Sequence, residues 1–391
     1  GIECDIVVAT GVKQVASIQN QLGNKVDIVL EPTRRDTFPA ISLAASYLFF
    51  EKHTKSDEVI IVLPVDPYTD LGYFRTLERM IEKVENESVN MALMGVQPTY
   101  PSAKYGYIIP NEETQRVERF QEKPTKELAA ELIKEKALWN GGVFAFKVGY
   151  MMDILRDYID FNCYKDVELQ YHLLPKISFD YEVVEKEATI AYVKFDGMWK
   201  DLGTWNTLTE VMDNDALGKV VLEGMSENTH VINELDIPIV VLGTKNIVVA
   251  ASPDGILVSD KNESSYLKEF LKDFSGRPMC EEHRWGEYRV IDYVHYPDGS
   301  SSLTKSLIIK AGEYQDYVAH KSRDEIITVV NGRGSIVIDG DIQEINSGDT
   351  IHIRRGQKHA IRALKTLRLI EVQVGLQIIE EDAKKTEWLW L

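Results

Sequence analysis

Short apolar runs alternate with longer mixed stretches along the first half of the chain. Residues 6–9, 26–30, 59–63 and 91–94 are short and mainly apolar, which predicts buried strands. The intervening residues 12–21, 39–51 and 73–87 have the length and composition of helices. This βαβ order predicts an α/β domain over residues 1–212, with a mostly parallel sheet and helices on both faces.

The pattern changes after residue 212. Residues 213–276 hold short apolar runs at 237–241 and 247–250 and one helical stretch at 265–274, which predicts a β-rich connector. From 277 to 391, alternating runs at 326–330, 335–338 and 350–353 are separated by pairs typical of hairpin turns, Asn331-Gly332 and Asp339-Gly340. This last stretch predicts an antiparallel double-sheet barrel of the jelly-roll or cupin kind.

The chain is acidic, with a formal net charge of −18 over 391 residues. Such a charge repels nucleic acid and anionic membranes, so neither is expected as a partner. Cys4, Cys163 and Cys280 have no C-x-x-C spacing, which favours a reducing compartment over a disulfide framework or a zinc knuckle. The sequence has no apolar run of about 18 residues and no charged-then-apolar leader, so we expect a cytoplasmic protein.

Two aspartates are candidates for a metal site. Asp66 follows the apolar run 59–63, where a carboxylate suits a Mg²⁺ that meets substrate phosphates through one or two carboxylates. Asp201 precedes Gly203, whose missing side chain lets the backbone approach a ligand closely. The plain alternatives are a turn aspartate at position 66 and the N-cap of a helix over 204–212 at position 201, and the residues alone leave both open.

Three further stretches carry groups suited to an anionic or sugar ligand. Residues 31–39 run from a strand end into a helix and include two arginines, so they can hold an anionic, base-bearing ligand. Glu122 and Lys123 offer a carboxylate for hydroxyls and an ammonium for phosphate, although an exposed charged turn is the commoner fate of such a pair. Asn140, followed by two glycines, suits a sugar or a plain turn into a buried strand.

Short motifs follow one another in order over residues 31–205. They are Glu31-Pro32 with Arg35, Thr37 and Pro39; Pro64 with Asp66; Tyr105-Gly106-Tyr107-Ile108; Glu122-Lys123-Pro124; Trp139-Asn140-Gly141; Asp180-Tyr181 with Glu185-Lys186; and Trp199, Asp201, Gly203 and Trp205. Together they resemble the mannose-1-phosphate guanylyltransferase family. The resemblance implies a Rossmann-like mixed, mostly parallel nucleotidyltransferase domain that makes GDP-mannose and pyrophosphate from GTP and mannose-1-phosphate.

The resemblance also implies a role for each matching residue. Asp66 and Asp201 would hold Mg²⁺, and Lys123 would face the sugar phosphate. The nucleotide would lie near the segment 31–39, with Glu31, Arg35, Thr37 and Pro64 as its contacts. The mannose would be held by Gly106, Glu122 and Asn140, with Glu185 and Lys186 lining the same pocket.

The sequence departs from the family pattern at three points. The family has a glycine-rich loop after its first strand, which wraps the nucleotide phosphates; since residues 5–9 resemble a second strand, we expect an N-terminal segment to be omitted here. Asp36 stands where asparagine is usual, and Pro67 where histidine is common, which bears on base selectivity. The alternatives are a nucleotidyltransferase for another base or hexose, and a sugar-nucleotide-binding or regulatory protein without turnover.

Residues 277–391 resemble the type II phosphomannose isomerase cupin that is fused to this transferase in bifunctional enzymes. The resemblance rests on residues 283–288, 311–312 and 370–375. Val318 replaces the family's glutamine ligand, while His320, Glu325 and His359 keep a set of two histidines and one carboxylate. We expect a remnant of a metal site without mannose-6-phosphate isomerase activity, in a domain that serves structure or assembly. Sheet edges in the connector make a homo-oligomer a further expectation.

Overall fold

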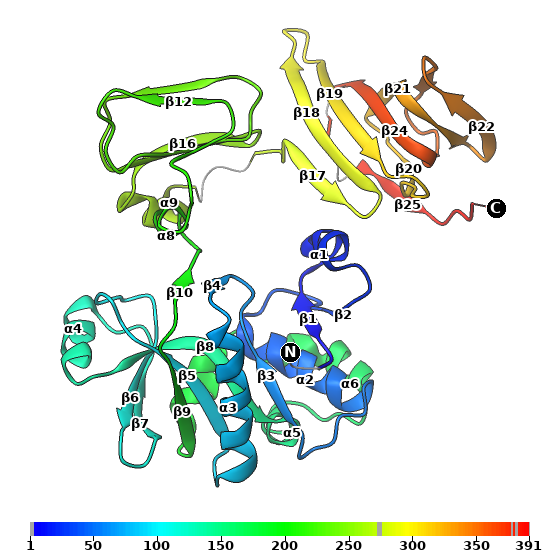
Figure 1. The fold of residues 1–391 in the computed structure, drawn as a ribbon. Helices are drawn as coiled ribbons and strands as arrows, with labels where there is room; N and C mark the ends of the chain where they lie inside the picture. Colours follow the sequence, from blue (N-terminus) through cyan, green and yellow to red (C-terminus); the bar gives the residue numbers. More distant parts are fainter. Residues whose placement is uncertain (1–3, 272–275, 377, 380–381, 391) are drawn as a thin grey trace. The chain divides into compact units, whose positions relative to one another are not determined.

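The computed structural model describes residues 4–271, 276–376, 378–379 and 382–390. The chain divides into two compact units, Gly1–Gly203 and Thr204–Leu391. Helices and strands alternate in the first unit, whereas strands dominate the second (Figure 1).

The elements of the first unit follow the order expected from the sequence. They are β1 (Val7–Thr10), η1 (Val12–Gln14), α1 (Val15–Leu22), β2 (Asp27–Leu30), α2 (Thr37–Phe50), β3 (Val59–Val62), β4 (Pro67–Thr69), α3 (Gly72–Asn86), β5 (Met91–Val96), β6 (Tyr107–Asn111), β7 (Arg116–Gln121), α4 (Lys126–Lys134), β8 (Leu138–Lys147), α5 (Val148–Arg156), α6 (Tyr164–Gln170), η2 (Tyr171–Leu173), α7 (Phe179–Glu182), η3 (Val184–Lys186), β9 (Ile190–Phe195) and β10 (Trp199–Asp201). The apolar runs at 6–9, 26–30, 59–63 and 91–94 become β1, β2, β3 and β5, and the predicted helices are confirmed as η1 with α1, α2 and α3.

The centre of this unit is a six-stranded sheet in the order β3-β8-β5-β9-β7-β6. Successive side chains of β5 pack in different hydrophobic clusters on the two faces of the sheet, because side chains alternate between the faces along a strand. Met91 and Leu93 pack with residues of α2 and α5, whereas Ala92 and Met94 pack with residues of α3 and α4. Helices therefore cover both faces of the sheet, which confirms the α/β class (Figure 1).

The sheet is mixed, and its strand pairings are less often parallel than the βαβ order alone suggested. β5 and β9 pair in parallel, and β1 and β2 form a separate parallel pair. The reason for the difference is β8, a ten-residue strand that runs antiparallel to β3 on one side and to β5 on the other. β6 and β7 also join each other by antiparallel pairing.

The second unit begins with the helix α8 (Trp205–Thr209) and a set of short strands. These are β11 (Ala216–Leu217), β12 (Val220–Glu223), β13 (His230–Asn233), β14 (Ile239–Leu242), β15 (Ile247–Ser252) and β16 (Gly255–Asp260), followed by η4 (Glu263–Tyr266) and α9 (Leu267–Phe270). β11, β13 and β15 pair in parallel, as do β12 and β14, so the chain alternates between two sheets as it coils. The predicted helix at 265–274 corresponds to η4 and α9, and its residues 272–274 lie outside the described residues.

The remaining strands form one curled antiparallel sheet, the predicted cupin-like barrel. They are β17 (Cys280–His283), β18 (Gly286–His295), β19 (Ser301–Ile309), β20 (Tyr317–Ala319), β21 (Arg323–Ile338), β22 (Asp341–Asn346), β23 (Thr350–Ile353), β24 (His359–Gly375) and β25 (Lys384–Thr386). Asp339 and Gly340, both with positive φ, make the tight turn between β21 and β22 that the sequence predicted.

The prediction of a turn at Asn331-Gly332 was wrong. Both residues lie inside β21, where the register against β24 shifts between Val329 and Arg333. Gly332 has a φ of 105°, and a Cβ there would stand 2.2 Å from the Thr366 carbonyl oxygen. The glycine therefore serves a bulge that brings two backbones close together, and the strand continues through it.

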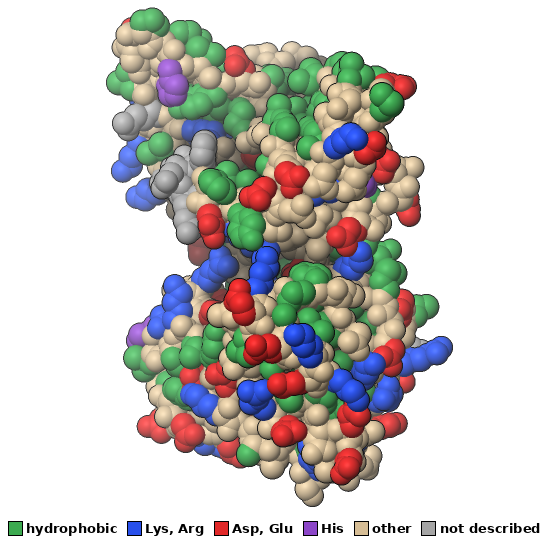
Figure 2. Space-filling view, turned by 90° about the vertical axis from the view of Figure 1, so that its left-hand side faces the viewer, with side chains coloured by type: hydrophobic (Ala, Val, Ile, Leu, Met, Phe, Trp, Pro, Cys, Tyr) green, Lys and Arg blue, Asp and Glu red, His purple; other side chains and the backbone are tan. Residues whose placement is uncertain are grey.

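No helix among the described residues is both long and apolar enough to cross a bilayer. Acidic and basic side chains are interspersed on the face of the molecule seen in Figure 2.

Candidate functional site

A short strand pair brings the backbones of the two candidate metal-binding aspartates close together. β4 runs antiparallel to β10, and Asp201 lies opposite Pro67. Asp66 immediately precedes Pro67 in the chain, so it is the next residue along from the partner of Asp201. Successive side chains along a strand point to opposite faces, so the pairing places the backbones of the two aspartates close together without fixing their carboxylates on one face. Two aspartates more than a hundred residues apart in sequence thus lie at neighbouring backbone positions.

Hydrogen bonds hold the Asp201 carboxylate at both oxygens. The Gly203 backbone N–H donates to Oδ1 at 2.8 Å, and the Tyr105 hydroxyl donates to Oδ2 at 3.5 Å. Tyr105 is itself held by Trp139 and Trp199, with ring centroids 4.9 and 5.6 Å away. The aromatic contacts restrict where the Tyr105 hydroxyl can lie, and the carboxylate is oriented accordingly.

The helix-cap interpretation of Asp201 is wrong. α8 begins at Trp205, and its N-cap is Thr204, whose side chain accepts a hydrogen bond from the Thr207 N–H at 3.3 Å. Thr204 therefore satisfies the helix terminus, which leaves the Asp201 carboxylate available for another partner.

Asp66 is exposed to solvent, but its charge reaches the buried first turn of α3. Burial, together with the nearby Asp66 carboxylate, raises the pKa of Tyr73 to about 12. Asp66, directly before β4, and Asp201, on β10, carry carboxylate oxygens of the kind that Mg²⁺ prefers. The donor chemistry of the two residues therefore suits a divalent cation.

Gly106 and Glu122 are in direct contact in a second group of side chains. Glu122 is only 7% exposed, so it is not part of a solvated charged turn. A Cβ at Gly106 would stand 2.5 Å from Glu122 Oε2, which is closer than such atoms can approach. The absence of a side chain at position 106 therefore makes room for the Glu122 carboxylate.

Lys123 and Glu185 extend this group. The Lys123 ammonium lies 3.0 Å from Glu122 Oε1, and half of the Lys123 side chain is exposed. Lys123 has a φ of 41°, in the left-handed region, so the backbone turns sharply after the buried Glu122. Glu185 Oε1 accepts a hydrogen bond from the Glu122 N–H at 3.3 Å. An accessible ammonium thus stands beside a buried carboxylate.

Asn140 joins the same group through Asp180. The Asn140 N–H donates to the Gly106 carbonyl at 2.8 Å, and its side-chain Nδ2 donates to Asp180 Oδ1 at 2.7 Å. Burial and the Glu122 carboxylate raise the pKa of Asp180 to about 6. Asp180 belongs to a motif of the sequence, but no role was predicted for it. The usable signal was its place in that motif, because neither hydropathy nor spacing distinguishes it.

The segment implied to hold the nucleotide is tied to residues 171–179. Glu31 Oε2 accepts from the Tyr171 hydroxyl at 2.8 Å, and Arg35 Nε donates to the Leu174 carbonyl at 3.0 Å. Thr37 Oγ1 accepts from the Phe179 N–H at 2.8 Å, one residue before Asp180. The residues expected to contact the nucleotide and those expected to contact the sugar therefore meet at the start of α7.

The remaining two predicted site residues differ in their contacts. Pro64 lies against the segment that carries Asn140, because a Cβ on Gly142 would stand 3.6 Å from Pro64 Cγ. Lys186 instead forms an ion pair with Glu182, which also accepts from the Tyr158 hydroxyl. The structure thus brings Pro64 to the group and gives Lys186 a partner outside it.

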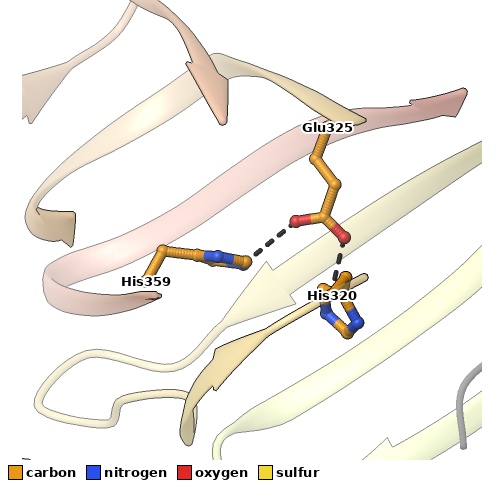
Figure 3. A group of neighbouring side chains, drawn as sticks. All are labelled: His320, Glu325 and His359. Carbon is orange, nitrogen blue, oxygen red and sulfur yellow. Dashed lines mark ion pairs between the residues drawn. The ribbon is translucent and has the colours of Figure 1, made fainter. Parts of the chain in front are cut away.

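In the barrel, His320, Glu325 and His359 come together as the sequence suggested (Figure 3). Their nearest ligand atoms all lie within 4.8 Å of one another, and all three residues are buried. His359 Nε2 is 3.0 Å from Glu325 Oε2, and His320 Nε2 is 3.5 Å from Glu325 Oε1. These three side chains alone would provide ligands for a divalent ion.

A fourth side chain already occupies this cluster. The Arg323 guanidinium, on a residue only 2% exposed, donates from Nε to Glu325 Oε1 at 3.0 Å, and one of its terminal nitrogens is 3.2 Å from His320 Nε2. It also donates to the Ile379 carbonyl at 2.7 Å. The atoms of His320 and Glu325 that would face a metal ion are therefore engaged by a cation of the chain itself.

The charges of the barrel cluster are already compensated. Although burial opposes it, His359, His320 and Arg323 lower the pKa of Glu325, and Glu325 in turn raises the pKa of His359 against the effect of burial. Asp382 accepts from His320 Nδ1 at 2.9 Å and from Arg323 at 3.3 Å. A divalent ion here would lie beside a buried guanidinium of like charge, so the residues in this arrangement do not fit a metal.

Comparison with known proteins covers both units. Residues 5–217 match the family model for nucleotidyl transferases, and residues 277–387 match the one described as mannose-6-phosphate isomerase C-terminal.

Similar proteins span nearly the whole chain. A mannose-1-phosphate guanylyltransferase of Escherichia coli (strain K12) is 30% identical, over 98% of this chain and 87% of its own length. The alginate biosynthesis protein AlgA of Pseudomonas putida is 28% identical, over 92% of this chain and 80% of its own. A crystal structure from Thermus thermophilus, described as a mannose-1-phosphate geranyltransferase, superimposes with a TM-score of 0.56 at 30% identity, over 68% of this chain and 83% of that one.

Proposed function

This chain belongs to the mannose-1-phosphate guanylyltransferase family, and we propose that it transfers a guanylyl group from GTP to mannose-1-phosphate with the help of Mg²⁺. The products are GDP-mannose and pyrophosphate. The observation that supports the proposal is the β4–β10 pairing, which sets the backbone of Asp66 close to that of Asp201, whose carboxylate accepts a hydrogen bond from Tyr105, the residue before Gly106.

The reaction places modest demands on the side chains. The second pKa of a phosphate monoester lies near ~6, so mannose-1-phosphate is already mostly a dianion at neutral pH and needs no general base. One of its phosphate oxygens forms a bond to the α-phosphorus of GTP, and the bond from that phosphorus to the bridging oxygen of pyrophosphate breaks. The protein must therefore align two anions and offset their repulsion.

Each group of residues has a part in that alignment. Asp66 and Asp201 would hold Mg²⁺, which supplies positive charge to the phosphates when bound. Tyr105 and Gly203 orient Asp201 by hydrogen bonds, so that the carboxylate is fixed before a ligand arrives. Residues 31–39 and Pro64 form the side assigned to the nucleotide.

The sugar side is assigned to the residues around Lys123. Half of the Lys123 side chain is exposed, although its ammonium is paired with Glu122. The ammonium is therefore suited to a charge-assisted hydrogen bond with the phosphate of the sugar. Glu122 and Asn140 are buried polar groups that suit hexose hydroxyls, and Gly106 leaves the space for Glu122. Glu185 supports this side through the Glu122 backbone.

A substrate panel tests this proposal. The purified protein would be assayed with GTP, ATP and UTP, each against mannose-1-phosphate and glucose-1-phosphate, with pyrophosphate release as the readout. GTP with mannose-1-phosphate is expected to give the highest kcat/KM and to require Mg²⁺. A higher kcat/KM for another pair would reassign the base or the hexose, and no release with any pair would refute the proposed transfer.

For the barrel we propose a structural or assembly role. Arg323 engages the atoms of His320 and Glu325 that a metal would need, and an aldose–ketose isomerase requires acid–base groups beside its metal.

A further inference from the structure

Asp180 lies at the point where the two sides of the proposed site meet. It is the second residue of α7, whose N-cap Ser178 accepts from the Tyr181 N–H at 3.3 Å. The preceding Phe179 is fully buried and packs on Phe144 and Phe146, with ring centroids 4.9 and 5.6 Å away. The position of Asp180 is therefore fixed by the core of the unit.

The side chain of Asn140 depends on this carboxylate. Asn140 donates from Nδ2 to Asp180 Oδ1 at 2.7 Å and accepts at Oδ1 from the Gly142 N–H at 3.1 Å. Gly142 has a φ of 70°, in the region that glycine adopts without strain. Asp180 thus determines which way the Asn140 amide points, and the amide in turn fixes the turn that follows it.

The carboxylate also lies within electrostatic reach of the other sugar-side groups. Burial and the Glu122 charge raise the pKa of Asp180, whereas Lys123 acts on it in the opposite direction. Glu122 and Asp180 bring two carboxylates to the single ammonium of Lys123. This excess of negative charge away from water lowers the free energy of unfolding unless each carboxylate has further partners. A group that costs stability in this way, inside a proposed binding site, is a candidate for function.

We propose that Asp180 is a positioning residue of the sugar site, which orients Asn140 and, with Glu122, holds the Lys123 ammonium where the sugar phosphate binds. This inference rests on the proposed function for the identity of the ligand, a hexose 1-phosphate. The Asp180 side chain accepts its hydrogen bond from Asn140, on the sugar side, whereas Thr37 is bonded to the backbone N–H of Phe179. Removal of the Asp180 carboxylate is therefore expected to weaken binding of the sugar phosphate and to leave binding of the nucleotide largely unchanged.

The test uses two variants of Asp180. Asp180→Ala removes the hydrogen bond and the charge, and we expect KM for mannose-1-phosphate to rise about tenfold or more while KM for GTP changes less than about twofold. Asp180→Asn keeps an oxygen for Asn140 Nδ2 and removes only the charge, so it should retain more affinity than Asp180→Ala. Equal rises in both KM values, or no rise in either, would overturn the proposal.

A double-mutant cycle separates positioning from general loosening. If Asp180 acts through Asn140, the variant carrying both Asp180→Ala and Asn140→Ala should lose little more affinity for mannose-1-phosphate than the weaker-binding single variant. Additive losses of affinity would count against the coupling. Glu187→Gln is the matched control, because this carboxylate is bonded to Asn90, Tyr150 and Thr189 outside the site. It should leave both KM values unchanged.

Binding of mannose-1-phosphate alone, measured by calorimetry, keeps this inference distinct from the proposed function. If the wild-type protein binds mannose-1-phosphate, and Asp180→Ala binds it about tenfold more weakly, the positioning role stands even where no GDP-mannose is formed. If the protein makes GDP-mannose and the Asp180 variants bind and turn over like wild type, the positioning role is refuted and the proposed function survives. Thermal unfolding of each variant identifies any that fail to fold, in which case Asp180→Asn decides.

Discussion

The Glu122 carboxylate fills the space beside Gly106, with Oε2 2.5 Å from where a Cβ at Gly106 would stand. A methyl group there must displace the buried carboxylate, since Phe120 closes the other side at 2.7 Å. We predict that Gly106→Ala raises KM for mannose-1-phosphate by about tenfold or more with a smaller effect on KM for GTP.

The control for this substitution is Gly255→Ala. A Cβ at Gly255 meets nothing within 4 Å, so the same chemical change is made without a clash. If Gly106→Ala and Gly255→Ala had the same kinetics, the contact with Glu122 would have no bearing on sugar binding.

Asp66→Asn and Asp201→Asn are each expected to lower kcat by on the order of a hundredfold or more without unfolding the chain. Each substitution removes one charged metal ligand and leaves the side-chain volume unchanged. Pyrophosphate release at saturating Mg²⁺ is the measurement, and circular dichroism checks the fold. Asp57→Asn, an exposed aspartate of the same unit, is the control. Near-normal rates in both variants would remove these residues from the metal site.

Lys123→Ala should weaken the use of the sugar phosphate far more than the use of the nucleotide. We expect KM for mannose-1-phosphate to rise by roughly one to three orders of magnitude, because a charge-assisted contact is lost. Lys136→Ala removes a lysine whose exposed pair with Glu112 contributes little, and it should behave as wild type. An unchanged KM in Lys123→Ala would favour a purely solvent-facing lysine.

The pH dependence of stability should report Asp180. Its pKa rises from an ordinary value of 3.8 to about 6 in the folded chain, through burial and the Glu122 charge. The folded state therefore holds the proton more tightly, and the free energy of unfolding falls as pH rises from about 4 to about 6. We predict that Asp180→Asn removes this fall and raises Tm at pH ~7 by a few degrees, at about 2–4 °C per kcal/mol.

The Glu187 carboxylate is expected to have the opposite effect on stability in the same experiment. Burial opposes the shift, but hydrogen bonds from Thr189, Tyr150 and Asn90 lower the pKa of Glu187 to about 2. Its contribution to stability is present above the ordinary pKa of 4.5 and is lost as pH falls toward 2, so Glu187→Gln should lower Tm at neutral pH. If Asp180→Asn and Glu187→Gln changed Tm in the same direction, the Asp180 carboxyl would not be destabilised in the folded chain.

The barrel is expected to bind no stoichiometric metal and to lack mannose-6-phosphate isomerase activity. Elemental analysis of the purified protein, and conversion of fructose-6-phosphate with added Zn²⁺ or Co²⁺, are the measurements. Arg323→Gln removes the guanidinium from beside Glu325 and His320, and this variant should gain affinity for Zn²⁺ over wild type. Isomerase activity in the wild-type protein that is lost in His320→Ala would refute the expectation.

Local patterns in the sequence were sufficient for several strands and helices and for the class of fold. Apolar runs such as 91–94 predict strands because side-chain alternation and burial act over a few residues, and β5 is found there with both faces buried. The pairing of strands was less predictable. β8 pairs antiparallel with both β3 and β5, a choice that depends on contacts between segments distant in sequence.

The same division holds for the candidate site. The sequence by itself determined which residues are candidates for the chemistry, because the motifs around Asp66, Lys123 and Asn140 are local strings that resemble one family. Only the tertiary structure decided which of them come close: β4 and β10 bring the backbones of Asp66 and Asp201 together, and α7 sets Asp180 against Asn140. It also decided that Arg323 enters the barrel cluster, since whether a buried carboxylate receives a metal or a guanidinium depends on side-chain packing in three dimensions.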